Sequence, residues 1–85
     1  MKPIRLSGHA AEQLRFRGTE IAEIEKTIRE GLWKSAKSGR FECRMDFAFG
    51  KQWNNKIYRT KQVRPIFIET DNEILVITVY TYYFD

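Results

Sequence analysis

The spacing of the apolar residues changes halfway along the chain, and this change constrains the fold more than any other feature of the sequence. Ile21, Ile24 and Ile28 recur three and four positions apart, which places them on one face of a helix. In residues 40–49 the period falls to two, which is the period of a strand with one buried and one open face. Helices followed by strands predict an α+β domain, with the helices packed on an antiparallel sheet.

Two helices are predicted in the first third of the chain. Ser7 is a favoured N-cap for the first helix, and Gly18 ends that helix because glycine tolerates the left-handed conformation. Thr19 is the predicted N-cap of the second helix, and Gly31 closes it. We expect the two helices to form a tight helical hairpin hinged at Gly18 and packed on one face of the sheet.

The second half of the chain predicts strands. Residues 56–61 and 63–69 fit either one strand with a bulge or two short strands. Pro65 lies within them and cannot donate a ladder hydrogen bond, so it indicates an edge or a bulge. Residues 74–83 are β-branched or aromatic at almost every position, which predicts a central strand covered on both faces.

The composition excludes several classes of protein. Eighty-five residues fit one domain, residues 1–85, and a hydrophobic share of 42% with 14% aromatics is too high for a disordered chain. With one cysteine and one histidine, neither an intramolecular disulfide nor a closed zinc site is expected. Cys43 alternates with Phe41 and Met45 on the apolar strand face, so we expect it to be buried and unreactive. Because no apolar run resembles a signal peptide or a membrane span, the sequence predicts a cytoplasmic protein. Neither a metal nor a cofactor is expected.

Positive charge is concentrated in the middle of the chain. Residues 31–68 carry nine Lys or Arg against two acidic residues, whereas residues 69–85 carry four acidic residues and no Lys or Arg. A basic block of this kind favours a polyanionic partner, which means RNA, DNA or an acidic protein segment. A solvated sheet surface without any such partner is the other interpretation.

Two polar side chains on the first helix are candidates for chemistry. His9 is the single histidine, and it serves either as a general acid or base or as a packing residue. Arg17 shares the stripe of Ala10 and Leu14, so its guanidinium lies on an otherwise apolar face. Such a residue either pairs with a carboxylate or binds a phosphate.

The strands add cations and aromatic rings. On the polar face of residues 40–46, charges of opposite sign alternate, which predicts cross-strand ion pairs for Glu42 and Asp46. If Tyr80 and Tyr82 lie beside the basic strands, their rings can stack bases while the cations hold phosphates, as single-stranded RNA requires. Alternatively, both tyrosines fill the core and keep only a wet hydroxyl. The cations concerned are Arg44, Arg59, Lys61 and Arg64.

Known catalytic motifs are missing from the sequence. It contains no glycine-rich phosphate loop, no serine nucleophile elbow and no paired-carboxylate or metal-ligand spacing. RNA can be cleaved without any of these, because its own 2′-OH is the nucleophile. The protein then supplies a proton acceptor, a proton donor and cations for the charge that develops on phosphorus.

The two ends of the chain carry a family resemblance. The opening LSGHAAEQLRFRGTEIAEIEKTIREG and the ending RPIFIETDNEILVITVYTYYF resemble the HA…RG start and the V-x-TVY end of the DUF4258 family. This resemblance extends over nearly the whole chain, and only residues 31–62 are weakly matched. It implies a fold akin to small ribonuclease toxins of the RelE and BrnT type, with a cognate antitoxin protein as partner. The matched polar positions are Ser7, His9, Arg17, Thr78 and Tyr80.

Together these features predict a toxin-like, metal-independent endoribonuclease that acts on mRNA. The alternative is a non-catalytic basic module that binds RNA or an acidic partner protein. The expected catalytic residues are His9, Arg17, Arg64 and Tyr80. The expected RNA-binding residues are Arg44, Arg59, Lys61 and Tyr82.

Overall fold

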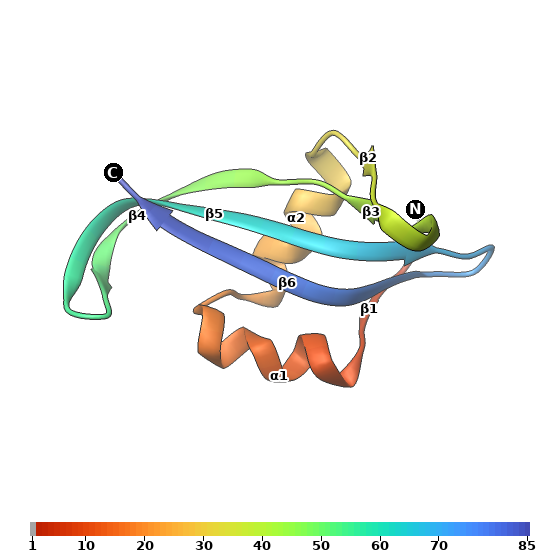
Figure 1. Cartoon of the computed structure of the whole chain (residues 1–85), viewed down its shortest axis with the longest axis horizontal. Coiled ribbons are helices and arrows are strands. Elements are labelled where there is room, and N and C mark those ends of the chain that lie inside the picture. Colours follow the sequence, from red (N-terminus) through yellow and green to blue (C-terminus); the bar gives the residue numbers. More distant parts are fainter. Residues whose placement is uncertain (1) are drawn as a thin grey trace.

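The protein is an α+β fold in which two helices lie against a six-stranded sheet (Figure 1). The computed structural model describes residues 2–85. In chain order the elements are β1 (Ile4–Leu6), α1 (Gly8–Arg17), α2 (Ile21–Glu30), β2 (Lys34–Ser35), the 3-10 turn η1 (Lys37–Gly39), β3 (Phe41–Glu42), β4 (Met45–Trp53), β5 (Lys56–Glu69) and β6 (Ile74–Phe84). The predicted change from helices to strands is confirmed.

The sheet is built around the long antiparallel pair β5 and β6. The strands follow the order β1-β6-β5-β3-β2, and β4 pairs with β5 on the same side as β3. Only β1 is parallel to its neighbour: its three residues pair with Ile74–Val76 of β6. This short edge strand was not predicted, because three residues carry too little periodicity to be recognised.

Pro65 lies within the central strand β5, beside a bulge, which is one of the two positions predicted for it. On one side of β5, β3 pairs with Ile66 and Phe67, and β4 pairs with Val63 and the residues before it. Pro65 therefore falls at the gap between these two partner strands, where a missing N–H disrupts little. The predicted bulge is present next to it, as a register shift against β6 between Ile66 and Phe67.

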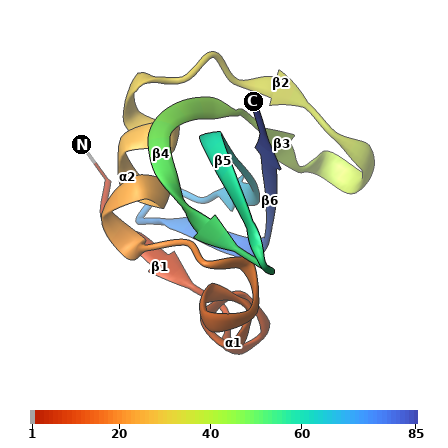
Figure 2. The same ribbon diagram turned by 90° about the vertical axis from the view of Figure 1, so that its left-hand side faces the viewer.

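The two helices contact different parts of the sheet. α1 lies along the edge of β6, whereas α2 packs on one face of β5 (Figures 1 and 2). Gln13 of α1 seals the edge, because its Oε1 accepts a hydrogen bond from the Val79 N–H at 3.0 Å. The tight helical hairpin is not confirmed: the two helices are joined at Gly18 and contact different strands, although both contribute to the same core.

The hydrophobic core fills the space between the helices and one face of the sheet. Its buried members are Ala10, Ile24, Ile28, Cys43, Val63, Phe67, Ile74, Val76 and Val79. The other face of β6 is open, since Tyr80, Tyr82 and Phe84 are 37%, 42% and 38% exposed. The prediction that β6 is covered on both faces is therefore wrong for its second half.

The helix ends follow the sequence closely. Ser7 caps α1, as predicted, by accepting a hydrogen bond from the Ala10 N–H at 3.1 Å. Gly18 ends α1 with φ at +67°, and an added Cβ there would lie 2.4 Å from the Tyr83 hydroxyl, so no other residue fits without rearrangement. The N-cap of α2 is Glu20, one residue beyond the predicted Thr19, because the Glu20 N–H donates to the Glu23 carboxylate at 3.0 Å.

The expected strand register is confirmed by Cys43. Its side chain is 2% exposed, and burial raises the pKa of its thiol to about 11. Phe41 pairs with Phe67 and Met45 with Val63, both core residues, so the two lie on the same face although the chain leaves the strand conformation between β3 and β4. Within residues 2–85, no helix is long and apolar enough to cross a membrane.

Candidate functional site

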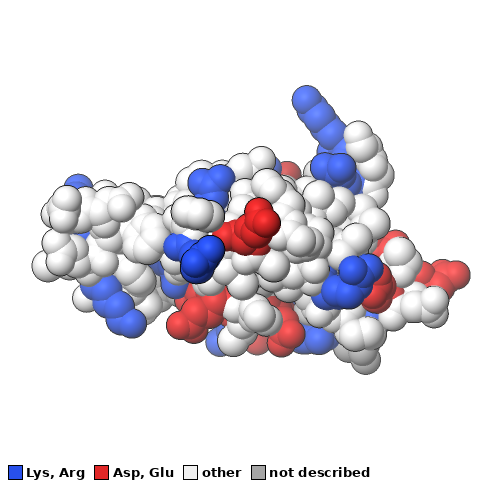
Figure 3. Space-filling model, turned by 90° about the horizontal axis from the view of Figure 1, so that it is seen from below, with Lys and Arg blue, Asp and Glu red and all other residues white. Residues whose placement is uncertain are grey.

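Over much of the molecule Lys and Arg side chains lie among acidic residues (Figure 3). Figure 3 views the side that carries α1, where blue and red groups alternate over the middle and the right-hand end of the surface. A continuous basic patch is not seen on this side. On this side, charge alone does not mark a site, so a site must be recognised from the arrangement of individual side chains.

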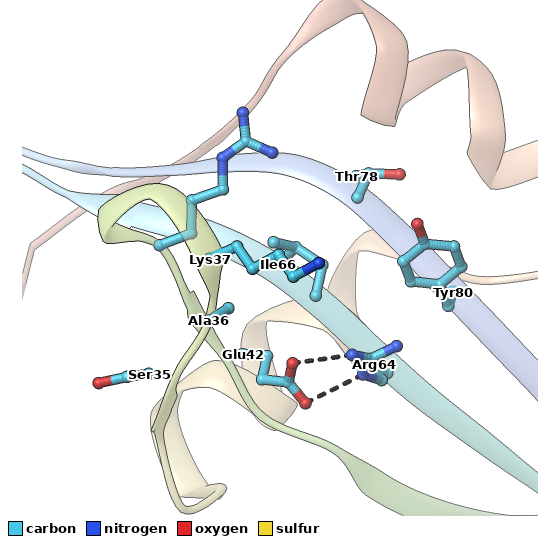
Figure 4. A pocket seen from close by; sticks show the side chains of 9 residues that line it. Ser35, Ala36, Lys37, Glu42, Arg64, Ile66, Thr78 and Tyr80 are labelled. Atoms are coloured by element: carbon cyan, nitrogen blue, oxygen red, sulfur yellow. Dashed lines mark hydrogen bonds and ion pairs between the residues drawn. The ribbon is translucent and has the colours of Figure 1, made fainter.

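A cleft of about 640 Å³ opens on the sheet face that α2 leaves uncovered. Its floor is formed by β5 and β6. One wall is the arm that runs from β2 through η1 to β3 (Figure 4). Figure 2 shows this arm on the side of the sheet away from α2. The lining residues are Ser35, Ala36, Lys37, Arg40, Glu42, Arg64, Ile66, Thr78 and Tyr80.

Arg64 and Glu42 form a two-pronged ion pair in the cleft. Arg64 Nε and Nη2 donate to the two carboxylate oxygens of Glu42 at 3.1 and 2.7 Å. These hydrogen bonds hold the pKa of Glu42 below its usual range and raise the pKa of Arg64, so both groups are charged at neutral pH. Arg44 also approaches Glu42, with Nη2 3.5 Å from Oε1.

Tyr80 lies between two guanidinium groups. Arg64 Cζ is 5.4 Å from the centre of the Tyr80 ring, and Arg17 Cζ, which comes from α1, is 5.8 Å from it. Both distances permit cation–π attraction. Arg17 forms no ion pair within residues 2–85, so of the two predicted partners for this cation the carboxylate is not found.

His9 reaches the same sheet face through Thr78. The His9 Nε2 lies 3.4 Å from Thr78 Oγ1, and that hydroxyl donates to Gln13 Oε1 at 2.7 Å. Thr78 and Tyr80 are two positions apart on β6 and therefore share a face. The structure thus places Arg17 and Arg64 against the Tyr80 ring, and His9 against Thr78, two positions from Tyr80 on β6.

Three of the predicted RNA-binding residues are also exposed. Tyr82 lies next to Arg64, whose Nη1 donates to its hydroxyl at 3.4 Å. Arg44 is 54% exposed beside Glu42, and Arg59 is exposed toward the hairpin end of β5.

Lys61 does not belong to this surface. It lies on the helix face of β5 with 6% of its surface exposed, and its Nζ is 2.8 Å from the Glu23 carboxylate and 3.0 Å from the Gly18 carbonyl oxygen. The prediction that Lys61 binds RNA is corrected on this ground, because a buried and paired ammonium cannot reach a phosphate. Its position follows from strand alternation, since Lys61 and the core residue Val63 are two positions apart.

Some residues that shape the site, among them Lys37, Arg40, Glu42 and Gln13, were not predicted as site residues. Lys37 and Arg40 are exposed cations on the arm, and both line the cleft. Their sequence signal was the basic segment before residue 41, but only the fold places that segment opposite β6. Glu42 and Gln13 were missed as site residues because each owes its position to a partner more than twenty residues away.

The described part of the chain offers no cluster of metal-binding side chains. Residues 2–85 contain no group of three or more His, Cys, Asp or Glu side chains that could hold a metal ion. The polar groups that line the cleft are guanidinium, ammonium, phenol, hydroxyl and one carboxylate, and the His9 imidazole lies beside Thr78. Such groups bind anions, stack against planar rings and transfer protons.

Comparison with known proteins gives no relative from which a role could be transferred. No family model matches the chain, and no curated protein and no solved structure matches it.

Proposed function

We propose that the protein is a toxin-like, metal-independent endoribonuclease that cleaves single-stranded mRNA in the cleft of the open sheet face. The observation that carries the proposal is the position of Tyr80 between Arg17 and Arg64. An exposed ring flanked by two cations matches a nucleotide, because the ring can stack a base while the guanidiniums hold the phosphates on either side.

The RNA itself supplies the nucleophile in this reaction. The 2′-oxygen attacks the adjacent phosphorus, the bond from phosphorus to the 5′-oxygen breaks, and the products are a 2′,3′-cyclic phosphate and a free 5′-hydroxyl. A base must take the proton of the 2′-hydroxyl, and an acid must protonate the leaving 5′-oxygen. Arg17 and Arg64 then stabilise the negative charge on the phosphoryl oxygens.

His9 and Tyr80 are the proton-transfer groups in the proposal. His9 is exposed at the start of α1 and hydrogen-bonds Thr78, so its imidazole lies beside the β6 positions that form the cleft floor. Tyr80 carries a hydroxyl that can donate to a phosphoryl or leaving oxygen. The two groups come from different elements, and α1 holds both His9 and Arg17 against β6 through Gln13.

Glu42 sets a condition on this function. Its carboxylate occupies both prongs of the Arg64 guanidinium, which are the donors that a phosphate would use. RNA must therefore share or displace these hydrogen bonds. This favours a site that is weak for a single phosphate and gains affinity from stacking on Tyr80 and from further contacts along the strand.

The test is cleavage of a defined single-stranded RNA in excess EDTA. We expect products that end in a 2′,3′-cyclic phosphate, with cleavage lost in Arg17→Ala and in Tyr80→Ala. Arg29→Ala is the matched control, because Arg29 is exposed on α2 and lies outside the cleft. Intact RNA after incubation with folded wild-type protein, together with normal growth of cells that express it, would contradict the proposal.

A non-catalytic binding module is the second candidate, and the Arg64–Glu42 pair favours it. In this case the cleft binds RNA or an acidic partner protein without turnover. In the first candidate function, an antitoxin-like partner would occupy the same cleft. Binding of an RNA without cleavage, abolished by Arg17→Ala, would decide for the module. Cleavage with the same residue dependence decides for the enzyme.

A further inference from the structure

The hairpin that joins β4 to β5 carries positive charge without acidic neighbours in sequence. We define it as residues 51–59, and call it the β4–β5 hairpin. Its three cations, Lys51, Lys56 and Arg59, are all exposed. Between Asp46 and Glu69 the chain has no acidic residue at all, so nothing within the hairpin neutralises this charge.

These cations differ from the other two in the same stretch of chain. Lys61 pairs with Glu23 and Arg64 with Glu42, whereas the three hairpin cations form no ion pair within residues 2–85. The acidic residue nearest to the hairpin in the strand register is Asp85, because Phe84 pairs with Thr60. Asp85 forms no ion pair with Arg59. In Figure 3 the left-hand end, where the hairpin lies, shows blue groups and no red ones.

The hairpin is held rigidly enough to present its charges as a unit. Asn54 and Asn55 turn the chain with φ values of +51° and +70°, the pattern of a two-residue hairpin turn. Trp53 stacks on Tyr83 with ring centres 4.9 Å apart, and Lys56 Nζ lies 5.1 Å from the centre of the Tyr58 ring. A pre-ordered surface of this kind loses little entropy when it binds.

The hairpin lies far from the cleft. Lys56 and Arg64 are eight residues apart on one strand, which is about 26 Å at roughly 3.3 Å per residue. Figure 1 shows the hairpin at one end of the molecule, whose longest extent is 42 Å. A mononucleotide cannot contact both places, whereas an extended polyanion can.

We propose that the β4–β5 hairpin is a second phosphate-binding surface, which holds the backbone of a single-stranded RNA several nucleotides away from the cleft. The inference rests on the proposed function for the identity of the polyanion. It extends that function, because it makes substrate length a determinant of affinity: a long RNA contacts cleft and hairpin together, and a short one contacts the cleft alone.

The experiment measures binding to RNA that cannot be cleaved, with every 2′-hydroxyl methylated. Long and trinucleotide versions, each fluorescently labelled, are titrated by anisotropy at several salt concentrations. The variant combines Lys51→Gln, Lys56→Gln and Arg59→Gln. Its matched control combines Arg15→Gln, Lys26→Gln and Arg29→Gln, which removes the same charge from exposed positions on the helices.

For the hairpin variant we expect the long RNA to bind about tenfold more weakly at low salt, and the log–log salt slope to fall by about 2, since each single-strand phosphate contact contributes ~0.7. The trinucleotide should bind the variant and the wild type equally, and the control should keep most of its affinity for the long RNA. Equal weakening by the control set would overturn the inference, because it would reduce the effect to net charge.

Two further outcomes separate this inference from the proposed function. If the long RNA binds through the hairpin but unmethylated RNA is never cleaved, the endoribonuclease proposal fails and the second surface stands. If RNA is cleaved in the cleft but the hairpin variant binds long RNA as tightly as wild type, the second surface is refuted. Tighter binding of an acidic peptide than of RNA at the hairpin would also refute it.

Discussion

Lys61 and Arg64 are three positions apart on β5, and the strand turns them to opposite faces. Both are paired with a carboxylate, but the pairs lie in different surroundings. The side chains of Lys61 and Glu23 are 7% and 17% exposed beneath the helices, whereas Arg64, 23% exposed, lines an open cleft with Glu42.

The difference separates a structural cation from a candidate functional one. Lys61 also donates to the Gly18 carbonyl oxygen and lies 5.2 Å from the centre of the Phe49 ring, so its partners are all parts of the fold. Arg64 contacts the exposed Tyr80 ring and donates to the Tyr82 hydroxyl, and in the proposed function it exchanges its carboxylate for an incoming anion. A basic strand residue is thus informative about binding only when its face is known.

The largest effect should come from breaking the buried pair. Lys61→Met leaves the Glu23 carboxylate and the Gly18 carbonyl oxygen without their shared donor, and we expect the free energy of unfolding to fall by about 3 kcal/mol. Urea denaturation measures it. The double variant Lys61→Met with Glu23→Gln should recover part of the loss, because it removes the unpaired charge. A loss below that of Arg64→Ala would contradict the structural role of Lys61.

Arg64→Ala should show the opposite profile. We expect a stability loss of about 1 kcal/mol or less, because the pair is partly exposed to water. RNA affinity in the cleft should fall about tenfold, which corresponds to ~1.4 kcal/mol. Urea denaturation and anisotropy with a methylated trinucleotide measure the two quantities on the same samples. Unchanged trinucleotide binding by well-folded protein would remove Arg64 from the site.

The sequence predicted those features that local chemistry determines. Ser7 and Gly18 delimit α1 because an N-cap hydroxyl and a left-handed glycine act within a few residues. Cys43 could be placed in the core because strand alternation is equally local. The same alternation already separates Lys61 from Arg64. The two residues are an odd number of positions apart, so a regular strand turns them to opposite faces, and both could not belong to one RNA surface.

The remaining features depend on contacts between distant parts of the chain. Glu42 meets Arg64 because β3 pairs with Ile66 and Phe67, a register that no local pattern specifies. Lys37 and Arg40 line the cleft because the arm folds over the open face. β1 forms only through its parallel pairing with β6, 70 residues later in the chain. The sequence could therefore indicate which kinds of residue meet in the cleft. It could not indicate that the arm forms the wall opposite β6.

Glu42→Gln should sharpen the contrast in the opposite direction from Arg64→Ala. The change removes a negative charge from the cleft and frees one prong of the Arg64 guanidinium, so we expect anionic ligands to bind more tightly, by about threefold. Anisotropy with the methylated trinucleotide measures this, and Asp46→Asn is the matched control because Asp46 contacts Gln62 outside the cleft. Weaker binding by Glu42→Gln would mean that the carboxylate positions Arg64 for RNA.

The smallest expected effect is the acid dependence of the Arg64–Glu42 pair. Hydrogen bonding from Arg64 lowers the pKa of Glu42 in the folded protein, so the pair stabilises the fold above the unfolded pKa of Glu, about 4.3. That stability is lost as the pH falls through the lower folded pKa. Urea denaturation at neutral and at strongly acidic pH should show Arg64→Ala costing less than about 1 kcal/mol at the first and nearly nothing at the second. Arg5→Ala, which removes the exposed partner of Glu73, is a matched control for an acid-sensitive pair outside the cleft. If the cost of Arg64→Ala were the same at both pH values, it would come from lost packing against Tyr80, and the ion pair would contribute nothing measurable to the fold.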